Sequence, residues 1–444
     1  MYHFLARPRA ILLLMAGMMA AACGGPTAVA DRPDAPVVPP VVTPSPITSP
    51  PAAPDHPAPS PDAPASPEPA TPVVGDPEPA APAAPKPAAP AKPAVWSKAR
   101  TVLRGGYCSE PVATIDAAGR FHVAVACDSR IRYATSTNGR TWTARTFNRP
   151  AHREEVAPEI AVDGRTLYVA FTRLKAVEGG CGDDGLMDVG VFYRKRQLPD
   201  GAWSAPVRIG QIGDRLQSFR VVGGVIHETY TSRDGQGPVS YGNLKGKTFR
   251  SVRLPGAVST SLRVGDDGVA RVAYSTGHKL RYATVRPDGR VSARTIFDGR
   301  VMQISEPSLV LGEGNRAYVS WAAHQPWGGG CADADRPMPK PGTYFATDAG
   351  GSWSVKRLSS RVSRPSLVLD RARGAAHIAF LEGRSVRHFT RDAAGSWADE
   401  RVPGTAQMDE VVVRSDPASG VLLLVGIRWD ERDGGVDIVA LTLS

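Results

Sequence analysis

The pentapeptide Ala317-Tyr-Val-Ser-Trp321 decides the fold, because variants of it recur along the chain after residue 96. Each variant is a short run rich in apolar, β-branched and aromatic residues, which is typical of a buried β-strand. The runs are spaced by 46, 59, 44, 47, 59 and 46 residues, the repeat length of four-stranded propeller blades. Together with Ala317–Trp321, they are Phe121–Val125, Leu167–Phe171, Ile226–Tyr230, Ala270–Tyr274, Ala376–Phe380 and Leu422–Gly426.

Each repeat has the same order of predicted strands. A first strand such as Pro307-Ser-Leu-Val-Leu311 leads through a glycine-containing turn to the recurrent run, and third and fourth strands follow across a polar turn. Helical periodicity is absent from these repeats. The sequence therefore predicts an all-β fold, a seven-bladed β-propeller, with a six-bladed propeller as the alternative.

The two ends of the repeat region complement each other. The last repeat provides only three strands, at 410–413, 422–425 and 437–441, whereas Trp96–Leu103 is a strand without a repeat of its own. Pairing of Trp96–Leu103 with the last repeat would complete a fourth strand and leave no long sheet edge exposed. This complementarity favours seven blades over six.

The first 23 residues are typical of an export signal. Arg7 and Arg9 precede the apolar run 10–22, which is too short to span a bilayer stably. Cys23 follows three alanines and precedes Gly24-Gly25, which resembles a bacterial lipobox, although Ala20 stands where leucine is commonest. The resemblance implies a lipidated Cys23 and a protein held on the outer face of a bacterial membrane; ordinary secretion is the alternative.

Residues 24–95 are predicted to form a disordered stalk. Most of the 41 prolines lie here, and such a composition cannot bury enough apolar surface to fold. The domain organisation that follows is a signal peptide at 1–23, a linker at 24–95 and a propeller at 96–444. The stalk is acidic, so the formal net charge of +10 comes from the other segments, mainly the propeller. A basic surface can attract anionic envelope polymers, or it can reflect an arginine-rich composition.

Apart from Cys23, the chain contains four cysteines, which we expect to form two disulfides in an oxidising compartment. We pair Cys108 with Cys127 across a predicted hairpin and Cys181 with Cys331, which lie in two long loops. Next to the latter pair stand the acidic residues Asp183, Asp184, Asp333 and Asp335. They are weak candidates for Ca²⁺ ligands, and solubilising loop acids are the alternative interpretation. We expect no resident metal and no cofactor.

Three turns between third and fourth strands carry a recurrent motif. They read Thr135-Ser-Thr-Asn-Gly-Arg-Thr-Trp142, Ala346-Thr-Asp-Ala-Gly-Gly-Ser-Trp353 and Thr390-Arg-Asp-Ala-Ala-Gly-Ser-Trp397. They resemble the Asp-box of bacterial neuraminidase repeat (BNR) proteins, the sialidase-like propellers. In that family the aspartate ties the amides of the turn and the tryptophan packs between sheets. The resemblance implies a propeller and does not by itself imply sialidase activity.

The sequence departs from sialidases where their catalysis resides. Sialidases carry an arginine triad, a Tyr/Glu pair and an acidic aspartate, with the first arginine in an Arg-Ile-Pro-like motif near the start of the domain. This chain has Cys108-Ser-Glu-Pro111 there, and its one Arg-Pro at the start of a first strand is Arg364-Pro365. Sialidases also have six blades. These departures favour a protein that is not an enzyme, with a glycoside hydrolase of sialidase-like fold or a lyase as the alternative.

The candidate ligand-binding residues are those expected at the starts of the first strands, on the top face of the propeller. They are Glu110, Glu159, Glu306, Arg364 and Glu410, with Trp327 from a long loop as a stacking residue. Such a ring can bind a ligand, take part in acid/base hydrolysis or simply line the channel. We expect a monomer that recognises a glycan, another cell-envelope component or a protein, with no nucleic-acid partner.

Overall fold

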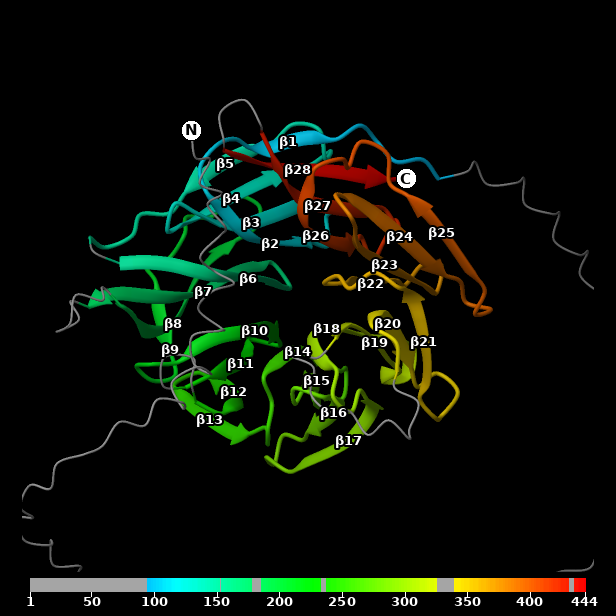
Figure 1. Cartoon of the computed structure of the whole chain (residues 1–444). Helices are drawn as coiled ribbons and strands as arrows, with labels where there is room; N and C mark the ends of the chain where they lie inside the picture. The colour runs from blue at the N-terminus through cyan, green and yellow to red at the C-terminus, as the bar shows by residue number, and fades with distance from the viewer. Residues whose placement is uncertain (1–93, 152, 178–184, 233–236, 326–338, 431–434) are drawn as a thin grey trace, which may run out of the picture. The chain divides into compact units, whose positions relative to one another are not determined.

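The described part of the chain forms seven four-stranded antiparallel sheets arranged as blades around a central channel (Figure 1). The computed structural model describes residues 94–151, 153–177, 185–232, 237–325, 339–430 and 435–444. This architecture confirms the all-β, seven-bladed prediction and excludes the six-bladed alternative. The signal peptide, Cys23 and nearly all of the stalk lie outside the described residues.

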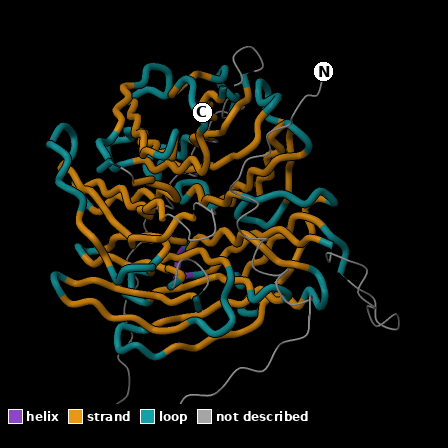
Figure 2. The backbone as a smooth tube through the Cα atoms, turned by 60° about the vertical axis from the view of Figure 1, so that its left-hand side comes forward, coloured by secondary structure: helices purple, strands orange, loops and turns teal. Residues whose placement is uncertain are grey.

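Six blades follow the chain, each with its strands in sequence order from the channel outwards. In Figure 2 the strands, drawn in orange, account for most of the tube. The six blades are β2–β5 (Cys108–Ile115, Phe121–Cys127, Arg130–Ser136, Thr143–Thr146), β6–β9 (Arg153–Asp163, Thr166–Val177, Gly185–Gln197, Val207–Ile209), β10–β13 (Arg215–Val222, Val225–Thr231, Val239–Lys245, Thr248–Arg253), β14–β17 (Ser259–Val264, Ala270–Ser275, Lys279–Val285, Val291–Asp298), β18–β21 (Gln303–Leu311, Ala317–His324, Gly342–Thr347, Ser354–Ser359) and β22–β25 (Ser366–Asp370, Ala375–Glu382, Ser385–Arg391, Trp397–Arg401).

The seventh blade is built from both ends of the domain. Its strands β26 (Met408–Ser415), β27 (Leu422–Trp429) and β28 (Val436–Leu443) are completed on the outside by β1 (Arg100–Leu103). Arg100 lies opposite Ala440, and the Ser97 amide donates a 2.7 Å hydrogen bond to the Thr442 carbonyl. Figure 1 shows β1 and β28 side by side. The predicted closure of the ring is therefore confirmed.

Apolar side chains between neighbouring sheets form the core. Trp321 of the fifth blade is fully buried, and its ring stacks on Tyr344 and contacts Phe297 of the fourth blade. Trp353, which ends the second motif-bearing turn, packs edge-to-face on Tyr282 of the fourth blade. This tryptophan thus lies between sheets, as the Asp-box resemblance implies. Asp348 of the same turn departs from the Asp-box pattern. Its carboxylate accepts a 2.7 Å hydrogen bond from the Ala317 amide at the start of β19, outside the turn.

A second set of contacts joins the inner strands of consecutive blades. The hydroxyl oxygen of Ser261 accepts a hydrogen bond from the Leu309 amide of the next blade, at 3.0 Å. Equivalent bonds of 3.0 to 3.2 Å run from Leu262 to Ser218, from Leu367 to Ser308 and from Val413 to Ser366. Since these serines occupy equivalent positions, they fix the register of the inner strands around the channel.

The predicted disulfide between Cys108 and Cys127 is confirmed. The two residues lie directly opposite each other in β2 and β3, with their Cα atoms 4.0 Å apart. Cys181 and Cys331 lie outside the described residues. Within the described part of the chain, no helix is long and apolar enough to cross a membrane.

We predict that the domain is destabilised when the strand from its N-terminal end is removed. A chain that begins at Gly105 lacks β1 and the buried side chains of Trp96, Val102 and Leu103. It should lose at least about 3 kcal/mol of unfolding free energy, since deleting one large buried side chain costs about that much. It should also associate through the uncovered edge of β28. Denaturant unfolding and light scattering measure both effects.

The matched control is a chain that begins at Ala94 and retains β1. Equal unfolding midpoints and equal monomer content for the two chains would show that the ring does not need this pairing.

Candidate ligand-binding channel

The inner strands enclose a cavity of about 340 Å³ along the axis of the propeller. The serine bonds between blades align these strands, so their side chains can be sorted into levels two residues apart. We call the level at the strand starts the upper level, that of the four serines the middle level, and the next one the lower level. The upper level contains Glu110, Ala157, Leu216, Ser259, Glu306, Arg364 and Glu410, all of which line the cavity.

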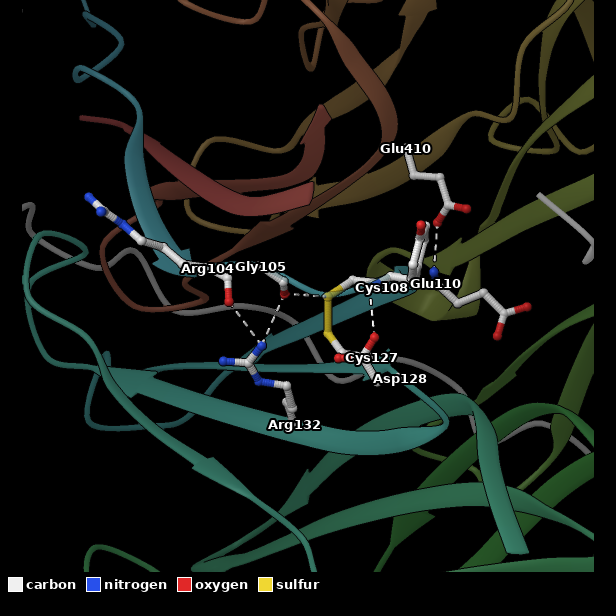
Figure 3. Close-up of a disulfide and its surroundings, with 9 residues drawn as sticks. Arg104, Gly105, Cys108, Glu110, Cys127, Asp128, Arg132 and Glu410 are labelled. Atoms are coloured by element: carbon white, nitrogen blue, oxygen red, sulfur yellow. Dashed lines mark hydrogen bonds between the residues drawn. A yellow bond between two sulfur atoms is a disulfide. The ribbon is translucent and has the colours of Figure 1, made fainter. Parts of the chain in front are cut away.

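Two upper-level glutamates hold the backbone of the next blade. The Glu410 carboxylate accepts a 2.9 Å hydrogen bond from the Glu110 amide, and the Glu110 carboxylate accepts one of the same length from the Ala157 amide. Figure 3 shows the Glu410 side chain directed at Glu110, beside the Cys108–Cys127 disulfide. These two carboxylates therefore have a structural role at the mouth of the channel.

The backbone at this level requires such support. Glu110, Ala157 and Glu306 have φ angles of 57°, 50° and 54°, a left-handed conformation that is uncommon for residues with a side chain. Each precedes a proline and lies at an irregularity in the pairing of the first and second strands. The third amide, that of Glu306, donates to the Ser259 hydroxyl at 3.3 Å. A side chain of the preceding blade thus satisfies every one of these three amides.

Glu306 and Arg364 form an ion pair across the fifth and sixth blades. The Arg364 Nη2 lies 2.7 Å from the Glu306 Oε1. The Arg364 side chain is 52% exposed and that of Glu306 35% exposed, so both remain accessible from the cavity. Burial opposes the charge on Arg364, but attraction to Glu306, Glu410 and Glu110 prevails and raises the pKa of its guanidinium. Arg364 is therefore the cation that attracts all three glutamates of the upper level.

The surroundings of Glu410 change the titration of its carboxyl group. Burial raises its pKa to about 7; Arg364 opposes this increase, and the neighbouring charge of Glu110 adds to it. A carboxyl with such a pKa exchanges its proton near neutral pH. Glu410 can therefore accept a hydrogen bond in one form and donate one in the other.

The structure brings together four of the predicted site residues, Glu110, Glu306, Arg364 and Glu410, but places Glu159 deeper. We expected Glu159 at the same level, whereas Ala157 takes that position and Glu159 belongs to the middle level. Corresponding irregularities occur in β2, β6 and β18, so that Ala157 aligns with Glu110 and Glu306. Glu159 follows Pro158 instead of preceding it, and therefore aligns with Val112 and Ser308 one level below. The Glu159 carboxylate pairs with Arg220 at 3.2 Å.

The remaining candidates fall on the long loops. Trp327, Asp183, Asp184, Asp333 and Asp335 lie outside the described residues. Within the residues that the structure does describe, no group of three histidine, cysteine or acidic side chains is suited to hold a metal ion.

Sequence reasoning missed three cavity residues, Arg220, Arg263 and Arg414. They occupy the lower level of the third, fourth and seventh blades. Their signal is present in the aligned first strands, because Arg220 and Arg263 each stand two residues after a channel-lining serine. In a strand, residues two apart face the same side.

The described part of the chain has the fold of a solved polysaccharide lyase. An ulvan lyase of polysaccharide lyase family PL25, solved with bound -[GlcA(1-4)Rha3S]-, has a TM-score of 0.52 and 11% identity over 76% of this chain and 94% of its own. The sialidase of Trypanosoma rangeli has a TM-score of 0.43 and 10% identity over 78% of this chain and 57% of its own. Hydrazine synthase of Kuenenia stuttgartiensis has a TM-score of 0.48 and 12% identity, over 73% and 94%. No protein-family model and no curated protein matches the chain. At 11% identity the likeness to the ulvan lyase shows the fold alone.

We predict that the upper-level charges set the titration of Glu410. Arg364→Gln should raise the pKa of Glu410 above its value of about 7, because it removes the cation that favours the carboxylate. Glu110→Gln should lower this pKa, because it removes a repelling charge. Each shift should be about one unit or more. Carbon-13 NMR of glutamate-labelled protein measures it, with the signal assigned by its loss in Glu410→Gln.

Arg250→Gln is the control, since Arg250 is exposed on the outer strand β13. A pKa of Glu410 that stays constant or falls in Arg364→Gln would contradict the assigned coupling.

Proposed function

We propose that this chain is a cell-envelope binding protein whose channel mouth recognises a hydroxyl-rich ligand such as a glycan, without converting it. The observation that carries the proposal is the accessible Glu306–Arg364 pair within the ring that Glu110 and Glu410 complete. Carboxylates accept hydrogen bonds from sugar hydroxyls, and a guanidinium donates them to hydroxyl or ring oxygens. The three glutamates stand on strands, and Arg364 lies two residues before β22, so the group is largely preorganised for binding.

The contacts of the carboxylates favour binding over catalysis. The carboxylates of Glu110 and Glu410 each accept a hydrogen bond from a backbone amide of the next blade, and Glu306 forms an ion pair with Arg364. A nucleophile or a strong base needs a carboxylate that is free to approach the substrate. These three side chains are better placed to orient hydroxyl groups than to attack a glycosidic carbon.

Enzymatic cleavage of an acidic polysaccharide is the second candidate function. Glu410 favours it, because a carboxyl with a pKa of about 7 can serve as general acid or base at neutral pH. The ulvan lyase of similar fold lends support to this class of substrate. In this alternative, Glu410 would exchange the proton while Arg364 stabilises negative charge on the substrate.

We predict that binding and turnover separate the two candidates. In a panel of neutral and acidic envelope polysaccharides, the double variant Glu306→Gln/Arg364→Gln should bind its ligand about tenfold more weakly than the wild type. Glu313→Gln should bind like the wild type, since Glu313 is exposed in the turn at the other end of β18. Biolayer interferometry measures the affinity, and assays for reducing ends and unsaturated products measure cleavage.

Cleavage by the wild type that disappears in Glu410→Gln, while binding persists, would establish the second candidate. Equal ligand binding by the wild type and the double variant would refute a binding site at the channel mouth.

We further propose that the protein is exported and carried on a lipid anchor at Cys23, with residues 24–95 as a tether and the propeller as a monomer. The sequence supports export and lipidation, because a cationic start and a short apolar run precede the Ala-Ala-Ala-Cys23-Gly-Gly junction. The chain should incorporate labelled fatty acid in a bacterial host, and Cys23→Ala should abolish that label. Cys331→Ala should keep it. Label on Cys23→Ala, or none on the wild type, would contradict the anchor.

A further inference from the structure

Below the middle-level serines, a cluster of positively charged side chains lines the cavity. Arg220, Arg263 and Arg414 come from the third, fourth and seventh blades and reach the same cavity from different sides. After burial, the positive charges of Arg220 and Arg414 are the largest influences that lower the pKa of Arg263. Converging guanidiniums are unusual in a protein interior unless anions balance them.

The protein itself balances only part of this charge. Within the described residues, Glu159 forms the one ion pair with the cluster, through Arg220 at 3.2 Å. Neither Arg263 nor Arg414 has a carboxylate of the described residues within ion-pair distance. Three guanidiniums and one carboxylate leave two positive charges in the lower part of the channel.

The hydrogen bonds of the three arginines leave donors available. Arg263 donates to the carbonyl of its own neighbour Leu262 at 2.7 Å, a contact that joins no two blades. Arg414 does join blades, because its Nε donates to the Ala113 carbonyl at 2.8 Å. A guanidinium has five N–H donors, so Arg263 in particular keeps most of its donors for a ligand. A purely structural role accounts for Arg414 better than for Arg263.

We propose that Arg220, Arg263 and Arg414 form a binding site for one oxyanion: a carboxylate, sulfate or phosphate group. Planar guanidiniums bind such groups through paired, charge-assisted hydrogen bonds. A cavity of about 340 Å³ accommodates a small anion or an acidic sugar. Bound at the lower level, a sulfate balances both positive charges that Glu159 leaves, and a carboxylate balances one of them.

Two titration effects agree with this assignment. Burial, followed by repulsion from Arg220 and Arg414, lowers the pKa of Arg263 well below its ordinary value. Burial and Arg220 likewise lower the pKa of Arg414 to about 10, against the attraction of Glu159. A bound anion would reverse both effects, which means that anion binding and the charge of these arginines support each other.

The site is independent of glycan recognition at the upper level. A free inorganic anion and the acid group of a larger ligand present the same chemistry to the arginines. Sulfate and phosphate test the first source, and glucuronate tests the second, with uncharged glucose as its control. Failure of glycan binding through Glu306 and Arg364 would leave the oxyanion site standing, and the reverse also holds.

We predict that sulfate, phosphate or glucuronate binds the full-length protein in isothermal titration calorimetry, at constant ionic strength set with sodium chloride. Arg263→Gln and Arg414→Gln should each weaken binding about tenfold, the effect of losing a hydrogen bond to a charged group. Glu159→Gln should strengthen binding up to about fivefold, because it removes the competing carboxylate and frees Arg220. Arg250→Gln, on the exposed strand β13, should leave the affinity unchanged.

Binding of glucuronate but not glucose would identify the acid group of a larger ligand as the source; binding of sulfate or phosphate alone would identify a free ion. Absence of binding for all three anions would overturn the proposal, as would unchanged affinity in the two arginine variants. Circular dichroism melting verifies that each variant is folded. Should Arg263→Gln or Arg414→Gln unfold, weaker binding in Glu159→Gln would still overturn the proposal.

Discussion

The backbone hydrogen bonds between β1 and β28 join the two ends of a ring of seven sheets, and the channel exists only because that ring is closed. Without this pairing the seventh blade would have three strands and a free edge. Closure also brings Glu410 of the last blade next to Glu110 of the first, 300 residues apart in the chain. The site at the channel mouth therefore depends directly on a contact at the outer edge of the propeller.

Inside the ring, the same side chains serve the fold and the site. Glu110 and Glu410 bind amides of neighbouring blades at left-handed backbone positions. The middle-level serines bind amides of neighbouring blades one level below. Such anchoring keeps the carboxylates in place before a ligand arrives, which lowers the entropic cost of binding. The same anchoring makes the carboxylates of Glu110 and Glu410 less available as nucleophiles. The Glu306–Arg364 pair is the part of the upper level that combines an anchored position with access to the cavity.

The channel has two electrostatic halves. The upper level contains three glutamates and one arginine, whereas the middle and lower levels contain Glu159 with three arginines. A ligand with hydroxyl groups at one end and an acid group at the other is complementary to this arrangement. A narrow channel walled by protein screens these charges less than bulk solvent does. The separation of charge along the axis therefore influences how a charged ligand is oriented.

The sequence by itself determined the architecture. The recurrent run around Ala317–Trp321, the orphan strand at Trp96–Leu103 and the opposed Cys108 and Cys127 are local or periodic features, and burial and hairpin geometry act on them directly. It also identified Glu110, Glu306, Arg364 and Glu410, since they stand at equivalent strand starts. Only the tertiary structure decided the depth of Glu159, because the pairing of the strands aligns Ala157, and not Glu159, with Glu110 and Glu306 at the upper level. The convergence of Arg220, Arg263 and Arg414 was likewise decided by closure of the ring, which brings together side chains from separate blades that no sequence spacing relates.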